Sequence, residues 1–404
     1  MKTLVIGGGP AGMISAYFRA KKGDEVVLVE RNEKLGKKLY ITGKGRCNVT
    51  NDCERGEFLE KVVTNPKFLT GAVMRFSPSD FMSFLEKKVR LKVERGNRVF
   101  PVSDKASDIT KCLESYLSDE KVAVRLNERV LSLEKTSDGF TAHTEKGKIC
   151  CDEVIICTGG KSYPTTGSTG DGYAFAESLG HSVTPVVPAL CGIDVKDDVT
   201  SLAGVSLKNV RISVTENGKE IFGEFGEMLF THTGVSGPIV LTASSFINKR
   251  DVSTLKISLD LKPALSEKQL GDRVLRDLSK NRGKLVKNSL GELLIKSLVP
   301  IVIASSGIDA EKSCDEFTKE ERQRFVHTVK NLTFTPKRLR PLEEAIVTSG
   351  GITTSEINPK TMESKIVKGL YFAGEVIDVD ALTGGFNITI AATTAYSAGG
   401  RGEN

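Results

Sequence analysis

Three glycines near the N-terminus have the spacing of a phosphate-binding turn. They form the motif Gly7-x-Gly9-x-x-Gly12, directly after the apolar run Thr3 to Ile6 and before a segment with helical periodicity. The first glycine permits a tight turn, the second lets a pyrophosphate approach the backbone, and the third lets helix and strand pack closely. The phosphates would then meet the positive end of the helix. The predicted contact residues of this turn are Gly7, Gly9, Pro10, Ala11 and Gly12.

An acidic residue follows at the distance expected of a ribose ligand. Glu30 ends the second apolar run of the chain, eighteen residues after Gly12, close to the ~20-residue offset of such carboxylates. A carboxylate there accepts hydrogen bonds from the hydroxyls of an unphosphorylated adenosine ribose. The alternative is a plain glycine turn followed by a surface glutamate, which we consider less favoured because strand, turn and helix come in the right order.

Two distant segments distinguish FAD from NAD as the dinucleotide. Cys157 to Gly160 follow an apolar run, as expected where the chain returns to the same cofactor. Residues 369–378 form a second strand-and-glycine segment that ends in Asp378, which suits the ribityl hydroxyls. Thr383 to Asn387 then open a predicted helix whose N-terminus would stabilise the negative charge of a reduced flavin. An enzyme that binds only NAD has no use for this second half, so we predict FAD.

The loop Leu35 to Asn51 combines glycines, cations and amides directly after Glu30. Its Lys38 and Arg46 have the charge to offset a phosphate or a flavin, and Asn48 has the hydrogen-bonding groups to bind the isoalloxazine ring. The glycine density indicates close approach of the backbone to another group. The alternative is a solvated basic loop.

The elements that must position these residues indicate an α/β fold. The first part of the chain reads as a sheet with helices, residues from about 189 read as short strands with glycine turns, and three helical stretches follow at 266–278, 289–298 and 318–332. The first style resumes after Pro341. We predict a discontinuous Rossmann-like FAD-binding domain (1–188 and 342–404), an inserted small β-barrel (189–262 and 333–341) and a helical subdomain (263–332).

Composition limits the remaining possibilities. The net charge of +6 is spread through the chain without a block of five like charges, and there is no tryptophan, so a nucleic-acid partner is not expected. The N-terminal apolar run is too short for a signal peptide, and the stretch 293–308 is too short to span a membrane, so we expect a cytoplasmic protein. The eight cysteines lack zinc spacing and are expected to be reduced thiols, and no metal site is expected.

Four motifs together resemble the BaiN-like flavoproteins, a family that includes proteins assigned as bile-acid reductases and as aminoacetone oxidases. They are Gly43-Lys44-Gly45-Arg46-Cys47-Asn48-Val49-Thr50-Asn51, the stretch from Gly159 to Gly172, Phe230-Thr231-His232-Thr233-Gly234-Val235-Ser236-Gly237-Pro238, and Ala373-Gly374-Glu375-Val376-Ile377-Asp378. The resemblance covers essentially the whole chain. It implies the same three-part architecture and a bound FAD. One departure is Phe386, where the family more often has tyrosine, which places any proton donation by that position in doubt.

The motifs and the resemblance together give one set of predicted FAD contacts. It consists of Gly7, Gly9, Pro10, Ala11, Gly12, Glu30, Arg31, Lys38, Gly45, Arg46, Cys47, Asn48, Val130, Thr158, Gly159, Gly160, Gly374, Glu375, Asp378, Gly385, Phe386 and Asn387. If a substrate lies between the FAD domain and the insert, His232 and Tyr163 are the predicted catalytic groups, with Thr233 and Ser236 as further polar candidates. The alternative for His232 is a structural turn of the barrel with local hydrogen bonds.

Flavin chemistry requires little more of the protein than positioning and electrostatics. We expect an FAD-dependent oxidoreductase, and favour an NAD(P)H-linked reductase of a small conjugated or steroid-like, bile-acid type substrate. Because the insert contains no second Gly-x-Gly-x-x-Gly motif after a strand, NAD(P)H would dock transiently. The alternatives are an aminoacetone-like amine oxidase that uses dioxygen, and a flavin-dependent RNA-modifying or redox-sensing protein. The oligomeric state stays open.

Overall fold

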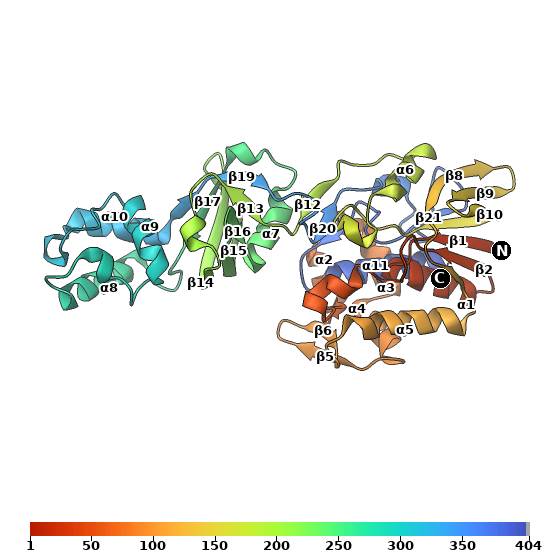
Figure 1. Cartoon of the computed structure of the whole chain (residues 1–404), viewed down its shortest axis with the longest axis horizontal. Coiled ribbons are helices and arrows are strands. Elements are labelled where there is room, and N and C mark those ends of the chain that lie inside the picture. The colour runs from red at the N-terminus through yellow and green to blue at the C-terminus, as the bar shows by residue number, and fades with distance from the viewer. Residues whose placement is uncertain (401–404) are drawn as a thin grey trace. The chain divides into compact units, whose positions relative to one another are not determined.

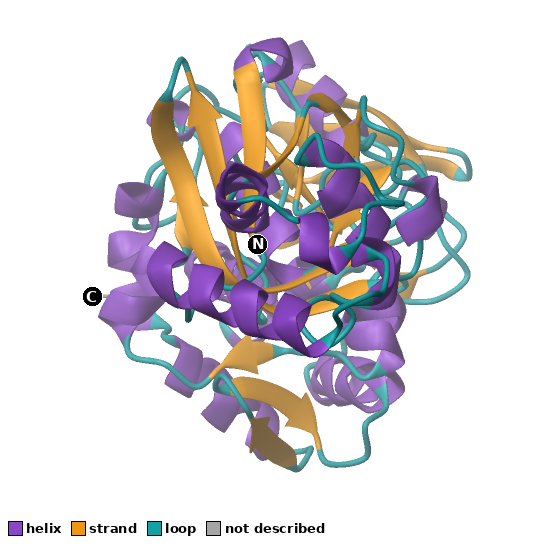
Figure 2. Ribbon diagram, turned by 90° about the vertical axis from the view of Figure 1, so that its left-hand side faces the viewer, coloured by secondary structure: helices purple, strands orange, loops and turns teal. Residues whose placement is uncertain are grey.

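A computed structural model describes residues 1–400 of the chain. The chain divides into two compact units, which we call unit 1 (residues 1–189 together with the part after 340) and unit 2 (residues 190–340). Helices and strands both contribute to the structure (Figures 1 and 2). No helix within the described residues is long and apolar enough to cross a membrane.

Unit 1 is built on a five-stranded parallel sheet with the strand order β21-β11-β1-β2-β7. The strands are β1 (Lys2–Ile6), β2 (Glu25–Val29), β7 (Ala123–Arg125), β11 (Glu153–Ile156) and β21 (Leu370–Phe372). Ile6 pairs with Ile156, which pairs in turn with Phe372, so the ends of three strands lie in one row. The central strands are apolar and buried, as parallel strands covered on both faces are. This sheet confirms the predicted Rossmann-like fold.

Helix α1 (Pro10–Lys21) begins with proline at its first turn, where the missing amide hydrogen costs nothing. It packs against α5 (Ala106–Asp119) and α11 (Phe386–Gly400). Its buried Arg19 pairs with Glu153 at 2.5 Å, which fixes the helix to β11. Aromatic rings fill the space between the helices, and Phe18 lies 4.8 Å from Tyr396 between ring centroids.

Smaller elements of unit 1 surround the parallel sheet. One antiparallel sheet consists of β8 (Val130–Thr136), β9 (Gly139–Thr144) and β10 (Gly147–Cys151). A second consists of β3 (Thr50–Asn51), β5 (Leu91–Glu94) and β6 (Arg98–Pro101). Two pairs join β4 (Val62–Thr64) to β22 (Asp380–Ala381) and β12 (Val187–Ala189) to β20 (Val347–Ser349). The other helices are α2 (Arg55–Glu60), α3 (Pro66–Arg75), α4 (Pro78–Glu86) and α6 (Asp171–Ser178).

Unit 2 contains a seven-stranded antiparallel sheet with the order β18-β17-β14-β15-β16-β13-β19. Its strands are β13 (Ile193–Val195), β14 (Ser206–Glu216), β15 (Lys219–Phe230), β16 (Gly234–Ser236), β17 (Leu255–Asp260), β18 (Leu332–Phe334) and β19 (Pro336–Leu339). The two outermost strands, β18 and β19, are separated in the chain by Thr335 alone. Helices α7 (Pro238–Ile247), α8 (Glu267–Lys280), α9 (Val299–Ser305) and α10 (Lys319–Lys330) complete the unit. Its division into a barrel and a helical subdomain stays a prediction.

One predicted helix of unit 2 was wrong. The apolar spacing of residues 289–298 suggested a helix there, but the chain forms turns and a short 3-10 segment, and α9 begins only at Val299. Pro300 occupies the first turn of α9, so the proline starts this helix and does not end the preceding one. The 3-10 segments of the chain are Leu39–Gly45, Pro164–Thr166, Thr200–Leu202, Val252–Thr254, Val286–Asn288, Lys296–Leu298, Cys314–Glu316 and Thr354–Glu356.

Candidate dinucleotide site and its relatives

Of the three motif glycines in the turn between β1 and α1, one borders space that a ligand could fill. A Cβ at Gly7, whose φ is 106°, would lie 2.5 Å from the carbonyl oxygen of Cys157, and one at Gly12 would lie 1.8 Å from the carbonyl oxygen of Gly7. A Cβ at Gly9 would meet no atom within 4 Å. Gly7 and Gly12 therefore serve close packing, while Gly9 borders open space at the N-terminus of α1, where a pyrophosphate fits.

Glu30 is held in place at the end of β2. Its side chain is buried, and one carboxylate oxygen accepts a hydrogen bond of 2.7 Å from the Gly8 amide. The other oxygen accepts bonds from the backbone and side-chain nitrogens of Asn32, at 2.8 and 2.6 Å. The oxygen that binds Gly8 keeps a free acceptor site for a ribose hydroxyl. Sequence reasoning missed Asn32, whose amide also donates to Thr166 and so joins two loops.

Arg31 and Val130 lie beside this carboxylate. The backbone of Glu30 bonds to Arg125 on one side and to Glu128 on the other, which places the start of β8, and hence the buried Val130, next to it. Arg31 donates to Thr169 at 2.7 Å. These contacts bring Arg31 and Val130 near Glu30, and their contact with an adenosine stays a prediction.

Asp171, at the start of α6, binds two arginines of this region. Arg129 donates to both of its carboxylate oxygens, at 2.9 and 3.0 Å, and Arg31 lies 3.4 Å away. Burial alone would raise the pKa of Asp171, but the hydrogen bonds from Arg129 and Thr169 outweigh it and lower the pKa. The carboxylate is therefore ionised and fixes both guanidinium groups.

The segments after β11 and β21 meet the same turn. Thr158 follows β11, and its buried hydroxyl oxygen has no hydrogen-bond partner within residues 1–400. Gly374 follows β21; a Cβ there would lie 2.9 Å from that of Ala11, and its amide donates to Thr394 of α11. Three motifs far apart in the sequence thus converge at the carboxyl ends of adjacent parallel strands, the usual place of a dinucleotide in such a sheet.

Asp378 lies deeper in the same region and is buried. Asn65 donates to its carbonyl oxygen at 2.7 Å and to its carboxylate at 3.2 Å. The amide of Asp378 donates to Ile352. These bonds fix the carboxylate that the sequence assigns to the ribityl chain.

Lys38 and Glu375, both predicted FAD ligands, bind each other. The Lys38 ammonium lies 2.8 Å from one carboxylate oxygen of Glu375 and donates to the Ser162 hydroxyl at 2.6 Å. The second oxygen accepts from Ser162 at 3.0 Å and from the Thr348 amide at 2.8 Å. Burial would raise the pKa of Glu375, but the charge and hydrogen bond of Lys38 lower it. The network therefore ties four segments that border the site.

Tyr163, one of the two predicted catalytic residues, directly follows Ser162 in this network. It is half-buried and has a left-handed backbone, with φ of 51°. An aromatic residue in this conformation is uncommon and indicates a constrained loop.

The loop that follows Lys38 contains the most distinctive motif. Arg46 binds Glu94 and Asp104 and stacks on the ring of Phe100 at 4.2 Å, so its charge is balanced within the protein. Cys47 is fully buried, and burial raises its pKa to about 11, as it does that of Cys53.

Asn48, two residues after Arg46, offers a free group to a ligand. Its side-chain oxygen is buried without a hydrogen-bond partner within residues 1–400. Gly45 precedes it in a turn with a φ of 87°. A buried oxygen of this kind is usually hydrogen-bonded, so Asn48 is the residue of the loop that is best suited to bind a ligand.

The turn before α11 lies directly against this loop. A Cβ at Gly385 would lie 2.4 Å from the carbonyl oxygen of Thr50. The ring of Phe386 packs in the core, 6.0 Å from that of Phe58, and the Asn387 side chain bonds to the backbone of Ala381. The side chains of Phe386 and Asn387 thus support the turn, which leaves their backbone amides to face a ligand.

These observations fit FAD. The open space at Gly9, the fixed carboxylate of Glu30, and the buried polar atoms of Thr158 and Asn48 lacking partners within residues 1–400 are features that a bound dinucleotide would use. The N-terminus of α11 would face the same ligand. The contacts themselves stay predictions.

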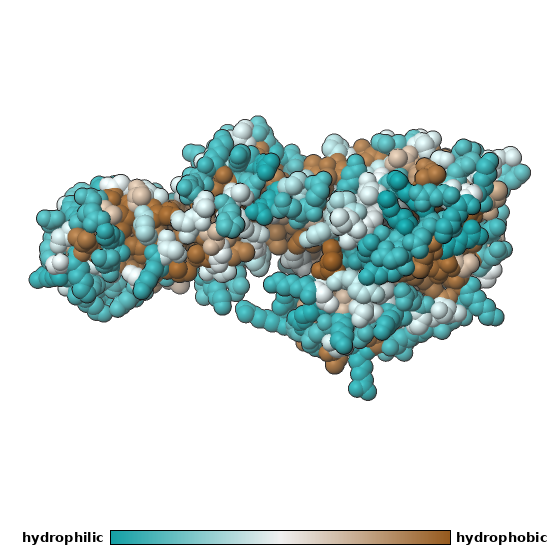
Figure 3. All heavy atoms as spheres, in the orientation of Figure 1, coloured by the Kyte–Doolittle hydropathy of each residue, from teal (hydrophilic) through white to brown (hydrophobic). Residues whose placement is uncertain are grey.

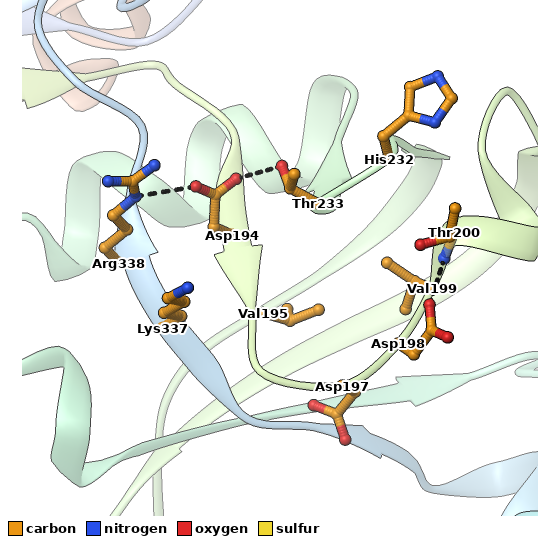
Figure 4. A pocket seen from close by; sticks show the side chains of 10 residues that line it. All are labelled: Asp194, Val195, Asp197, Asp198, Val199, Thr200, His232, Thr233, Lys337 and Arg338. Atoms are coloured by element: carbon orange, nitrogen blue, oxygen red, sulfur yellow. Dashed lines mark hydrogen bonds and ion pairs between the residues drawn. The ribbon is translucent and has the colours of Figure 1, made fainter.

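The other predicted catalytic residue, His232, lies in unit 2 and is exposed. It belongs to a pocket of about 230 Å³ (Figure 4). Figure 4 shows Asp194 between Arg338 and Thr233, with bonds of 2.9 and 2.6 Å, and the His232 ring beyond Thr233. Burial would raise the pKa of Asp194, but the hydrogen bond from Thr233 and the charges of Arg338 and Arg340 lower it. The pocket lining is Asp194, Val195, Asp197, Asp198, Val199, Thr200, His232, Thr233, Lys337 and Arg338.

Comparison with known families decides the classification. Residues 1–401 match the family described as HI0933-like protein Rossmann domain. The chain belongs to this family. The HI0933-like family match and its relatives confirm the resemblance to the BaiN-like flavoproteins, and this chain is an FAD-dependent oxidoreductase.

Two full-length relatives of this HI0933-like chain have different names. A 3-dehydro-bile acid delta(4,6)-reductase of Clostridium scindens is 30% identical over 404 residues, which cover 98% of this chain and 97% of that protein. A ribosomal RNA dihydrouridine synthase of Escherichia coli is 31% identical over 401 residues, which cover 98% of this chain and 96% of that protein. Among solved structures, a flavocytochrome c3 fumarate reductase in an open conformation has a TM-score of 0.52 at 19% identity, covering 99% of this chain and 77% of that one. The last similarity shows the fold alone.

Proposed function

We propose that this protein reduces a carbon–carbon double bond conjugated with a carbonyl group, with NAD(P)H as the electron donor. One observation carries the proposal. Two relatives of equal similarity have names that describe this reaction on different molecules, since a 3-dehydro bile acid with a delta(4,6) diene is a conjugated ketone and dihydrouridine is a uridine whose conjugated double bond is saturated. The shared chemistry is therefore a better guide than either substrate.

The site supplies what this reaction requires of the protein. Bound FAD would supply the hydride. Glu30 would bind the adenosine ribose and Asp378 the ribityl chain, and the N-terminus of α11 would face negative charge at the flavin. Reduction of a conjugated double bond also requires a proton at the carbon next to the carbonyl. Tyr163, in the loop that Ser162 fixes to Lys38, is our first candidate for this donor and His232 our second.

The first candidate substrate is a small conjugated ketone of the steroid or bile-acid type. It follows from the relative of Clostridium scindens and from the sequence motifs. The second candidate is a uridine in ribosomal RNA, which the relative of Escherichia coli favours at the same level of identity. The two substrates differ most in charge, because only RNA brings a row of phosphates.

The test uses the oxidative half-reaction. The purified yellow protein is reduced with dithionite without oxygen and mixed with a 3-oxo-4,6-diene bile acid or with unmodified ribosomal RNA, and the return of flavin absorbance is followed. We expect one of the two to reoxidise the flavin and to gain two hydrogens by mass spectrometry. If neither substrate reoxidises the flavin faster than buffer alone, the proposed reaction is wrong.

A further inference from the structure

A short segment of unit 1 contains far more positive than negative charge. Residues 87–98, which we call the basic hairpin, comprise the segment directly after α4, strand β5, a turn and the start of β6. They include six lysines and arginines and one acid, Glu94. Figure 3 shows hydrophilic side chains over the part of unit 1 where Figure 1 draws β5 and β6. The net charge of the whole chain does not reveal this local excess of positive charge.

The neighbouring acids are already occupied by other cations. Glu94 and Asp104 bind Arg46 and Lys92. Lys88 pairs with Asp119. These contacts balance two of the six hairpin cations locally.

Four cations of the basic hairpin stay without a carboxylate within 4 Å in the described part of the chain. They are Lys87, Arg90, Arg95 and Arg98, and all four are exposed. The Arg98 side chain donates a hydrogen bond of 3.0 Å to the carbonyl of Arg95. Exposed cations that no internal acid neutralises raise the positive potential of a surface and attract a polyanion.

The hairpin is fixed to the turn before α11, where we expect the flavin. The Asn51 side-chain nitrogen donates to the carbonyl of Gly96 at the hairpin tip, at 3.1 Å, and to that of Gly384 at 3.2 Å. The carbonyl of Asn97 accepts from the Asp52 amide at 2.7 Å. Gly384 belongs to the turn that opens α11. One amide group therefore joins the tip of the cationic hairpin to the turn expected to face the flavin.

We propose that the basic hairpin binds the sugar-phosphate backbone of structured RNA and so brings one strand to the flavin. This inference rests on the second candidate function. A small bile acid has a single negative charge and gains little from four separated cations, whereas RNA presents phosphates in a row. The nearest ring, Phe100, is buried and unavailable for stacking on a base. The hairpin therefore positions RNA through phosphates and reads little of its sequence.

The test compares two variants from which three positive charges have been removed. One carries Arg90→Gln, Arg95→Gln and Arg98→Gln. The control carries Lys135→Gln, Lys146→Gln and Lys148→Gln, on strands β8 and β10 and the turn between β9 and β10, and none of the three belongs to the predicted FAD contacts. Flavin absorbance and melting temperature are compared first, so that only folded holoprotein is used. Binding to deproteinised ribosomal RNA is then measured by fluorescence anisotropy over a series of KCl concentrations.

We expect the arginine variant alone to lose affinity. With about three phosphate contacts removed, the slope of log K against log salt should fall by about 2 to 3, and affinity near 0.1 M salt should fall roughly 100-fold. An unchanged arginine variant, or an equal loss in the lysine control, would overturn the proposal. So would arginine-dependent binding to phosphatidylglycerol vesicles without binding to RNA.

The binding assay contains no reductant, so it separates this inference from the proposed function. If RNA binding depends on the three arginines but the RNA is never reduced, the surface assignment stands and the uridine candidate fails. If RNA is reduced equally well by the arginine variant at limiting RNA concentration, the hairpin does not deliver the substrate and the inference is wrong.

Discussion

At the scale of single residues, the glycines of the first turn have separate roles that mutation can distinguish. Gly9→Ala places a methyl group in the open space where we expect the pyrophosphate. We predict that FAD affinity falls about tenfold or more, which corresponds to about 1.4 kcal/mol, while the apoprotein melts as before. Isothermal titration of the apoprotein with FAD measures the affinity, and scanning calorimetry of the apoprotein measures its melting temperature.

Gly12→Ala is the matched comparison. Its methyl group would overlap the carbonyl oxygen of Gly7, so we predict a loss of about 3 kcal/mol in the free energy of unfolding of the apoprotein. Urea unfolding checks this value. Equal stability of the Gly12→Ala variant and the unmodified chain would show that α1 does not pack on the turn as described.

The sequence predicted residues whose role follows from local spacing. Gly9 and Glu30 are examples, because the motif, the strand and the acid lie within one βαβ unit. The partners of Arg46 could not be predicted, because Glu94 and Asp104 lie 48 and 58 residues away and nothing in the sequence pairs them. Local spacing predicts which residues could contact a ligand, whereas the choice between a ligand and an internal partner depends on tertiary packing.

At the scale of elements, Lys38 and Glu375 tie the loop after β2 to the segment after β21. The two side chains are about one-fifth exposed, so their interaction is only partly screened. We predict that Lys38→Met alone costs about 2 kcal/mol in unfolding free energy, because it leaves the carboxylate without its cation. The double variant Lys38→Met with Glu375→Gln should cost less than the sum of the single variants, as measured by urea unfolding of the four proteins. Additive losses would contradict a direct pair.

His181 links the end of α6 to residues 356–364. Its side chain is fully buried and contacts Glu356 at 3.0 Å and Ser364 at 2.7 Å. Burial lowers the pKa of His181, so the folded protein favours the neutral ring. Its contribution to stability is therefore complete above the ordinary histidine pKa of about 6.5 and is lost as pH falls below it toward the lower pKa of the folded state.

This reasoning predicts a pH effect that one substitution removes. Between pH 7.5 and 5.5 the unmodified protein should lose more unfolding free energy than the His181→Gln variant, as measured by urea unfolding at each pH. Glu356, whose pKa is also lowered, contributes its loss mainly below about pH 4.5 and does not obscure the comparison. If the unfolding free energies of the two proteins fall equally with pH, His181 does not cause the pH dependence.

Apolar periodicity predicted the helices of which only one face is buried. The spacing of α8 and α10 matched the structure, and both begin and end near the predicted positions. The helix predicted at 289–298 does not form. The leucines of this stretch are buried although its backbone forms turns, so their spacing indicates burial and does not specify a helix. Apolar spacing reports burial, and burial without a repeating backbone does not define secondary structure.

At the scale of the whole molecule, the two units have separate hydrophobic cores. The chain leaves unit 1 after β12 and returns before β20, and these strands pair with each other, Ala189 opposite Val347. A Gly-Ser linker that replaces residues 190–340 should therefore give a folded unit that holds FAD. We predict a yellow, monodisperse protein by gel filtration and absorbance that lacks substrate turnover. A colourless aggregate would show that unit 1 requires unit 2 to fold.

The overall α/β architecture was predictable because strands, glycine turns and helices alternate in the sequence. The seven-stranded order of unit 2 was not, since it places β13 beside β19, whose residues are more than 140 positions apart. The basic hairpin also escaped notice, because the sequence shows the cations but not which acids neutralise their neighbours. Long-range pairing is the information that a single sequence lacks.

The most direct test of the central claim is anaerobic stopped-flow absorbance of the purified yellow protein mixed separately with NADH and with NADPH. We predict rapid loss of the flavin band with one of them, followed by its return when a conjugated ketone or unmodified ribosomal RNA is added. If neither nicotinamide bleaches the flavin, while a small amine such as aminoacetone does and peroxide appears on exposure to air, the protein is an oxidase and the proposed reductase is wrong.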